Sequence, residues 1–115
     1  MKLVAEVYRL QQTFPKYETY ALCDQLRRAV VSIPANIAEG NARKHEKERV
    51  QFLHVSLGSL AEVDTLIDVA VTLSYIETRP VIIDELTESI GKMLSGLIRP
   101  STIDHRQSNV NDKLS

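Results

Sequence analysis

Apolar residues recur at three- and four-residue spacing through most of the chain, which is the period of an amphipathic α-helix. The pattern predicts four helices, at residues 1–14, 20–43, 46–75 and 80–98. Pro15 ends the first helix, and Pro80 suits the first turn of the fourth. Residues 100–115 are polar and without a period, so we expect a disordered tail there. An antiparallel up-and-down four-helix bundle over residues 1–99 is the simplest packing of four such helices.

The helix expected at 20–43 is apolar on two opposite sides. Its core stripe comprises Leu22, Leu26, Ala29, Ile33, Ile37 and Gly40. The opposite side carries smaller residues, namely Val31, Ala35, Ala38 and Ala42. A helix that is apolar on both flanks needs a second cover besides its own bundle, so we expect a homo-oligomer. The alternative is that these alanines are good helix formers on a solvent-exposed face.

Polar side chains run along one edge of the same helix, beside its core stripe. We expect a hydrogen-bond network that fixes helix register, because polar groups near a core must be paired. The residues expected in this network are Gln25, Ser32, Asn36, Glu39 and, from the next helix, Glu62. Asp64 is a second candidate partner on that helix, and a ligand or partner site is the alternative interpretation.

The formal net charge is −1, but it is unevenly distributed. Basic residues gather in the first half of the chain, where the candidate phosphate contacts are Arg27, Arg28, Arg43, Lys44, Lys47 and Arg49. In a monomer such a cluster is a weak signal, since Glu46 and Glu48 lie among these side chains. Repeated once per subunit on one face of an assembly, it would bind a phosphate backbone more strongly. An acidic face within 62–88, presented to a basic protein partner, is the competing expectation.

No catalytic or metal-binding signature is present in the sequence. The histidines His45 and His54 lie nine positions apart, which is poor spacing for one metal site. Cys23 is the single cysteine, which excludes an intrachain disulfide and is typical of a reducing compartment. No apolar run approaches the roughly 20 residues that span a bilayer. We therefore expect a cytoplasmic protein that is not an enzyme and that uses no cofactor, metal or small-molecule substrate.

Four sequence words carry a resemblance to a known family: QLRRA at 25–29, SIPANIAEG at 32–40, FL at 52–53 and LGSLAE at 57–62. In their order and spacing they resemble the bacterial four-helix-bundle proteins associated with intervening sequences in 23S rRNA genes. The resemblance covers residues 1 to about 99. The same superfamily includes the accessory protein of diversity-generating retroelements, which assists a reverse transcriptase. Relatives carry further residues before the segment matching 2–4, which implies a misassigned start codon or a shorter first helix here.

The resemblance also implies a ring-shaped homo-oligomer, a pentamer, and nucleic-acid binding as the usual proposal for the family. That proposal is strongest for the retroelement branch, whose members are distinctly basic, and this chain departs from them in its charge of −1. We therefore expect a non-enzymatic homo-oligomer that binds structured RNA or a ribonucleoprotein through a repeated basic face. The alternative is a protein–protein interaction scaffold with no nucleic-acid role.

Overall fold

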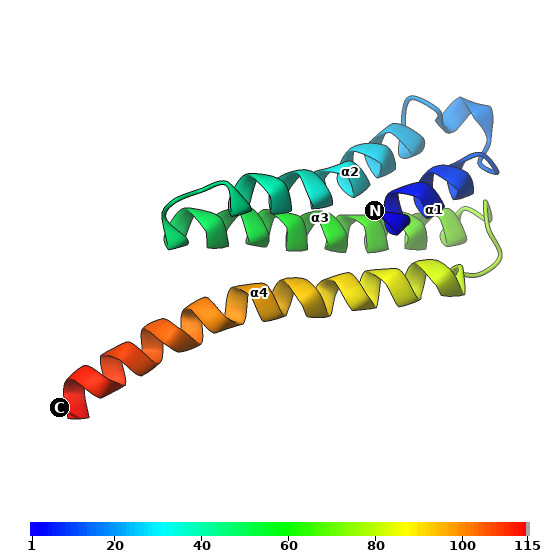
Figure 1. Ribbon diagram of the computed structural model, residues 1–115. Helices are drawn as coiled ribbons and strands as arrows, with labels where there is room; N and C mark the ends of the chain where they lie inside the picture. The colour runs from blue at the N-terminus through cyan, green and yellow to red at the C-terminus, as the bar shows by residue number, and fades with distance from the viewer. Residues whose placement is uncertain (115) are drawn as a thin grey trace.

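The computed structural model contains four α-helices (Figure 1). They are α1 (Lys2–Gln11), α2 (Leu22–Asn41), α3 (Glu46–Thr72) and α4 (Val81–Leu114), with a short 3-10 helix, η1 (Lys16–Glu18), between α1 and α2. The structure describes residues 1–98 with their side chains, and within them no strand is found. The prediction of an all-helical protein with four helices is confirmed. The predicted end of the last helix near Pro100 and the predicted tail at 100–115 lie outside the described residues.

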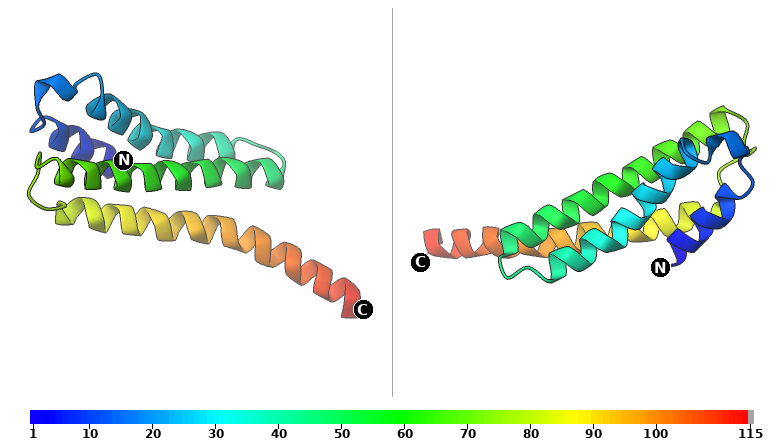
Figure 2. Two further views of the ribbon diagram at one scale, coloured as in Figure 1. Left: turned by 180° about the vertical axis from the view of Figure 1, so that it is seen from behind. Right: turned by 90° about the horizontal axis from the view of Figure 1, so that it is seen from above.

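The chain reverses direction at each connection, so that α1 and α3 run one way and α2 and α4 the other (Figure 1). Both α1 and α3 pack against α2 and α4. At 1.5 Å per residue, the 10 residues of α1 extend about 15 Å and the 20 residues of α2 about 30 Å. As a result α1 covers only part of the length of its neighbours (Figure 2).

The first three helices are shorter than the apolar periodicity predicted, because local contacts close their ends early. After α1, the amide of Phe14 donates to the carbonyl of Gln11 at 3.0 Å, and the ring of Phe14 turns into the core. Before α2, the backbone amide of Leu22 donates to the carboxylate of Glu18 at 3.4 Å. The helix therefore begins at Leu22 and not at residue 20 as predicted. After α3, Ser74 adopts a φ of 62°, which stops the helix before Tyr75.

The core is built from aliphatic side chains of all four helices. Fully enclosed members include Leu3 and Val7 on α1, Leu26 and Ile33 on α2, and Ile67 on α3. The stripe predicted for the second helix is buried at every position except Ile37, which is partly buried. That helix therefore turns the expected face inward.

The helical period of the apolar residues in α4 predicts a buried seam of Ile83, Leu86, Ile90, Met93 and Leu97. The residues that are buried in the structure differ from this prediction. Leu94 is fully buried and Thr87 nearly so, whereas Met93 is 47% exposed and Leu97 36% exposed. The reason is that α1 lies against only the first part of α4, so that farther along only α3 offers a surface to pack on. The helix turns Leu94 toward α3 and leaves Met93 uncovered.

Gly40, at the last turn of α2, allows the close approach of α2 to the start of α3. A Cβ at this position would lie 3.1 Å from the carbonyl oxygen of Arg49 and 3.1 Å from Cβ of Phe52. We expect Gly40→Ala to lower the free energy of unfolding by about 1–3 kcal/mol, because backbone atoms must move apart. Gly58→Ala is the matched control, since a Cβ there meets nothing within 4 Å. Urea unfolding of both variants measures the difference, and equal midpoints would contradict the packing argument.

Candidate functional site

The outer face of α2 is the surface that the sequence predicts as the contact between copies of the chain. Val31 is 43% exposed, and the three alanines predicted to accompany it, Ala35, Ala38 and Ala42, are exposed as well. This side of α2 lies opposite the stripe that packs into the core. The result is an exposed strip of small apolar side chains, which a second helix can approach closely.

The predicted polar network forms in part, between α2 and α3. The hydroxyls of Ser32 and Ser59 lie 2.8 Å apart, and Nδ2 of Asn36 donates to Oγ and to the carbonyl oxygen of Ser32, both at 2.8 Å. About one helical turn before Ser59 on α3, the buried Oγ of Ser56 donates to the carbonyl of Ile33 at 2.8 Å. These short side chains occupy the line along which the two helices meet, so they hold α2 and α3 in one register.

Three residues expected in this network lie elsewhere. Gln25 and Glu62 are exposed, and Glu39 pairs with Arg43 at 2.9 Å. Ser59 takes the place predicted for Glu62 or Asp64, because only a short side chain fits where the two helices approach closely. Asp64 faces the opposite side of α3, where it binds a different partner.

The six predicted basic residues do not form one cluster. At 1.5 Å per residue, Arg27 lies about 21 Å from Asn41 at the end of α2, and Arg43 follows beyond that end. The guanidinium of Arg27 donates to Oε1 of Gln11 at 3.2 Å and to the carbonyl of Thr19 at 3.1 Å, and so ties the α1–α2 connection to α2. Arg28 pairs with Asp24 at 3.1 Å. This pair of arginines supports the fold locally and lies far from the α2–α3 turn.

The other four basic residues lie at the α2–α3 turn. Arg49 donates to Glu46 at 2.7 Å and to the carbonyl of Leu97 at 3.1 Å, so it joins α3 to α4. Arg43 lies over the ring of Phe52, 4.8 Å from its centroid. Lys44 and Lys47 are exposed. The turn therefore presents a basic tip of three residues, Arg43, Lys44 and Lys47.

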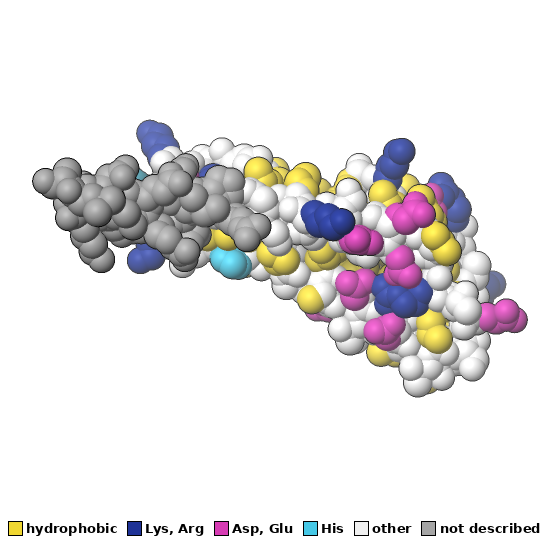
Figure 3. Space-filling view, turned by 90° about the horizontal axis from the view of Figure 1, so that it is seen from below, with side chains coloured by type: hydrophobic (Ala, Val, Ile, Leu, Met, Phe, Trp, Pro, Cys, Tyr) yellow, Lys and Arg dark blue, Asp and Glu magenta, His cyan; other side chains and the backbone are white. Residues whose placement is uncertain are grey.

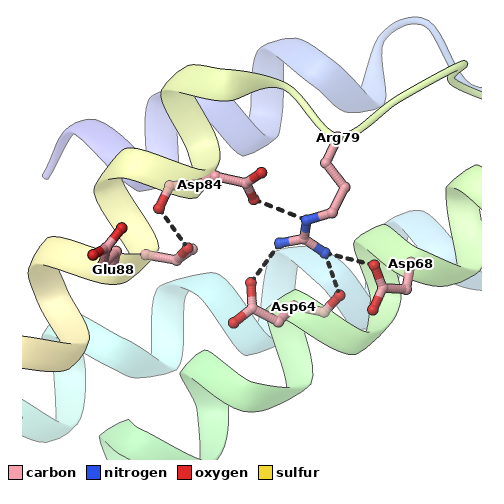
Figure 4. A pocket seen from close by; sticks show the side chains of 6 residues that line it. Asp64, Asp68, Arg79, Asp84 and Glu88 are labelled. Atoms are coloured by element: carbon pink, nitrogen blue, oxygen red, sulfur yellow. Dashed lines mark hydrogen bonds and ion pairs between the residues drawn. The ribbon is translucent and has the colours of Figure 1, made fainter.

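Arg79 is the centre of a cluster of carboxylates, which the sequence analysis missed. Its guanidinium donates to Oδ1 of Asp64 at 2.6 Å, of Asp68 at 2.8 Å and of Asp84 at 2.8 Å (Figure 4). A fourth bond reaches the carbonyl of Asp64 at 2.9 Å. Figure 3 shows the acidic side chains gathered around one basic group on this face of the molecule. The cluster joins α3, the α3–α4 connection and the first turn of α4.

The electrostatics of this cluster favour a permanently charged arginine. Burial opposes the charge of Arg79, but its hydrogen bonds to Asp68, Asp84 and Asp64 outweigh burial and raise its pKa above the ordinary value. One positive charge faces three negative ones, so the surface stays acidic. A sequence signal existed, since Arg79 is the only arginine or lysine between Arg49 and Lys92 and has acidic residues on both sides of it in the sequence.

A second group of polar contacts joins the α1–α2 connection to the α3–α4 connection. The Tyr75 hydroxyl donates to Oε2 of Glu18 at 2.5 Å and lies 3.3 Å from the Tyr17 hydroxyl. Its ring packs against Phe14 at a centroid distance of 5.6 Å. The hydrogen bond to Glu18, followed by that to Tyr17, raises the pKa of Tyr75.

This shift predicts a loss of stability at high pH. The pKa of Tyr75 is raised in the folded state, so its contribution is complete below the unfolded value of about 10 and declines as the pH rises above it. We expect Tyr75→Phe to lose less stability than the parent between pH 9 and 11. Burial also raises the pKa of the Cys23 thiol, so both proteins should carry Cys23→Ala. Parallel urea titrations measure the effect, and identical pH profiles would contradict it.

The described residues contain no group of three or more side chains that could hold a metal ion. His45 and His54 are both exposed, and Cys23 is buried. Within the same part of the chain, no helix combines the length and the apolar character needed to cross a membrane. The described residues thus present three surfaces: the apolar outer face of α2, the basic tip at the α2–α3 turn and the acidic cluster around Arg79.

These features define a small all-helical protein with four α-helices. A family model described as 23S rRNA-intervening sequence protein matches residues 1–96. The chain belongs to this family, which confirms the resemblance seen in its sequence words. A comparison with curated proteins gives no match.

Proposed function

We propose that the protein is a non-enzymatic scaffold of the cytoplasm, in which copies of an antiparallel four-helix bundle assemble through the outer face of α2. The observation that carries this proposal is the exposed strip of Val31, Ala35, Ala38 and Ala42. Its four side chains are apolar and uncharged, which is the composition expected at the centre of an interface. A closed ring of five copies is the assembly that we propose, because the resemblance seen in the sequence words implies one.

The basic tip gives the assembly a second property. Arg43, Lys44 and Lys47 project from the α2–α3 turn of each copy, so a closed ring carries one tip per subunit. Single tips bind phosphate weakly, but several tips on one face act together on one RNA molecule. Arg27 and Arg49 are left out of this contact, because their guanidinium groups support the fold. We propose structured RNA as the partner, and the mention of 23S rRNA in the family's description is in keeping with that choice.

Fluorescence anisotropy with a labelled, structured RNA tests the proposal. We expect a Kd of about 1–10 µM at 50 mM salt, weakening at least about tenfold at 200 mM salt. The double variant Arg43→Glu and Lys47→Glu should abolish binding. The matched control carries Lys2→Glu and Lys16→Glu, which change the net charge equally at exposed positions away from the tip. Flat binding curves at 50 mM salt, or an equal loss in the control, would refute the RNA contact.

A second candidate function follows from the acidic cluster around Arg79. Asp64, Asp68 and Asp84 give this surface an excess of negative charge, which favours a basic protein partner. Affinity capture from the native host, with and without nuclease, separates the two candidates. A partner that is retained after nuclease treatment, and lost from an Asp68→Lys variant, favours the protein scaffold. A partner lost on nuclease treatment favours RNA.

A further inference from the structure

Tyr20 is the most exposed large apolar side chain among the described residues, with 92% of its surface open to solvent. It lies two residues before the start of α2, and the exposed strip of that helix begins farther on, at Val31. Tyrosine has a large apolar ring and a hydroxyl that forms hydrogen bonds, and it is enriched among the residues that dominate binding at interfaces. The strip on α2 is therefore preceded by an aromatic side chain that a partner can bury.

A pocket of about 210 Å³ lies between the end of α1 and the start of α4. Its apolar lining residues are Leu10, Pro80 and Ile83, and its polar lining residues are Glu6, Arg9 and Thr13. Pockets that bind drug-sized molecules have volumes of about 300–1,000 Å³. This pocket is smaller, and its mixed lining suits a single tyrosine side chain, whose ring is apolar and whose hydroxyl is polar.

We propose that Tyr20 of one copy of the chain fills this pocket of the next copy. The inference rests on the proposed assembly through the outer face of α2, and it names the surface of the neighbouring copy that this face meets. The tyrosine and the pocket are different surfaces, so the contact is head-to-tail, and head-to-tail contacts are the kind that build closed rings of five. Two strips that paired with each other would give only dimers.

The spacing of the exposed apolar residues on the two helices supports this contact. At 1.5 Å per residue, Val31 and Ala35 lie about 14 and 20 Å from the first residue of α2. Met93 and Leu97, which are 47% and 36% exposed, lie about 15 and 21 Å from Ile83 at the pocket. When α2 of one copy runs in the same direction as α4 of the next, with the tyrosine in the pocket, the two pairs come level with each other. The exposed apolar residues of α4 are then covered.

The order of the charges on the two surfaces is complementary as well. Along α2, away from Tyr20, the acidic Asp24 precedes the basic Arg28, and the two are paired at 3.1 Å. Along α1, away from the pocket, the basic Arg9 precedes the acidic Glu6, and these are paired at 2.6 Å. In the proposed contact Asp24 meets Arg9, and Arg28 meets Glu6. Charges of this kind at the rim of an interface fix its orientation more than they add to its affinity.

A dilution series followed by light scattering tests the role of the tyrosine. We expect Tyr20→Ala to lower the affinity between subunits at least about tenfold and to leave the fold unchanged, because the side chain is exposed in the single chain. Tyr17→Ala is the matched control. Tyr17 is 75% exposed in the same connection, but its ring lies 6.4 Å from that of Tyr75 in its own chain. Equal affinities in the two variants would overturn the proposal.

Mixing two variants tests whether the tyrosine and the pocket meet. Thr13→Arg places a long charged side chain at the pocket from an exposed position. We expect this variant and Tyr20→Ala each to be monomeric at a low micromolar concentration. Their mixture should form pairs of about 26 kDa, twice the chain mass of 13.0 kDa, because one tyrosine and one pocket remain intact.

The outcomes of the mixing experiment separate this contact from the assembly itself. A mixture that stays at 13.0 kDa, while the wild type assembles, would overturn the contact and leave the assembly through α2 standing. A wild type that is itself 13.0 kDa would overturn both. Pairs that form only in the mixture would support the insertion of Tyr20 into the pocket of a second copy.

Discussion

Replacing Arg79 with leucine is expected to lower the free energy of unfolding by about 2 kcal/mol, because it removes three partly exposed charge pairs at once. The side chain is 24% exposed and bonds to the carboxylates of Asp64, Asp68 and Asp84. Leucine leaves these three negative charges close together with no cation between them. The repulsion acts across the contact between α3 and α4, so these two helices are pushed apart.

The matched control for this prediction is Lys92→Leu. Lys92 is 78% exposed and pairs with Glu88 on the same helix at 3.2 Å, so its loss should change stability by less than about 1 kcal/mol. Urea unfolding at low salt measures both variants, and added salt should recover part of the loss in Arg79→Leu by screening the carboxylates. Equal midpoints for the two leucine variants would show that Arg79 is an ordinary surface cation.

The second large effect is expected at the outer face of α2. Ala35→Arg places a charged side chain at the middle of the proposed contact between copies, where it would be buried without a partner. We expect the subunit affinity to fall at least about 100-fold, enough to leave monomers at micromolar concentration. The fold itself should be unchanged, because Ala35 is exposed in the single chain.

Ala61→Arg is the control, since Ala61 is an exposed alanine on α3. It should leave the assembly intact, and circular dichroism should show the same helix content in both variants. An assembly that survives Ala35→Arg would place the contact between copies on some other surface.

The sequence predicted the helices and the inward face of α2, because a 3.6-residue period is a local property of the chain. The sequence did not predict which residues of a helix are buried where this depends on the length of the helix packed against it. On α4, the positions 83, 86, 90, 93 and 97 have the helical period, and so do Ile83, Thr87, Ile90 and Leu94. The limited reach of α1 decides between the two seams, and no pattern within α4 reveals it.

In the candidate sites too, the sequence predicted the features that depend on the period of one helix and missed those that depend on packing between helices. Exposure of Val31 and Ala35 was expected from their place opposite the core stripe. The pairing of Ser32 with Ser59 requires the register of α2 on α3, which is set by the whole interface. The role of Arg79 requires the start of α4 to lie beside the last turns of α3, and this contact depends on how the two helices pack. The division of the basic residues into two groups follows from the length of α2, which places Arg27 and Arg28 far from the α2–α3 turn.

Light scattering of the purified wild-type chain, at low micromolar concentration and moderate salt, tests the assembly most directly. If α2 is covered on its outer side by a second copy, the measured mass will be a whole multiple of 13.0 kDa, with five copies for a closed ring. A mass of 13.0 kDa would mean that Val31 and its neighbouring alanines face water in solution. That result would contradict the scaffold and the multivalent RNA contact together.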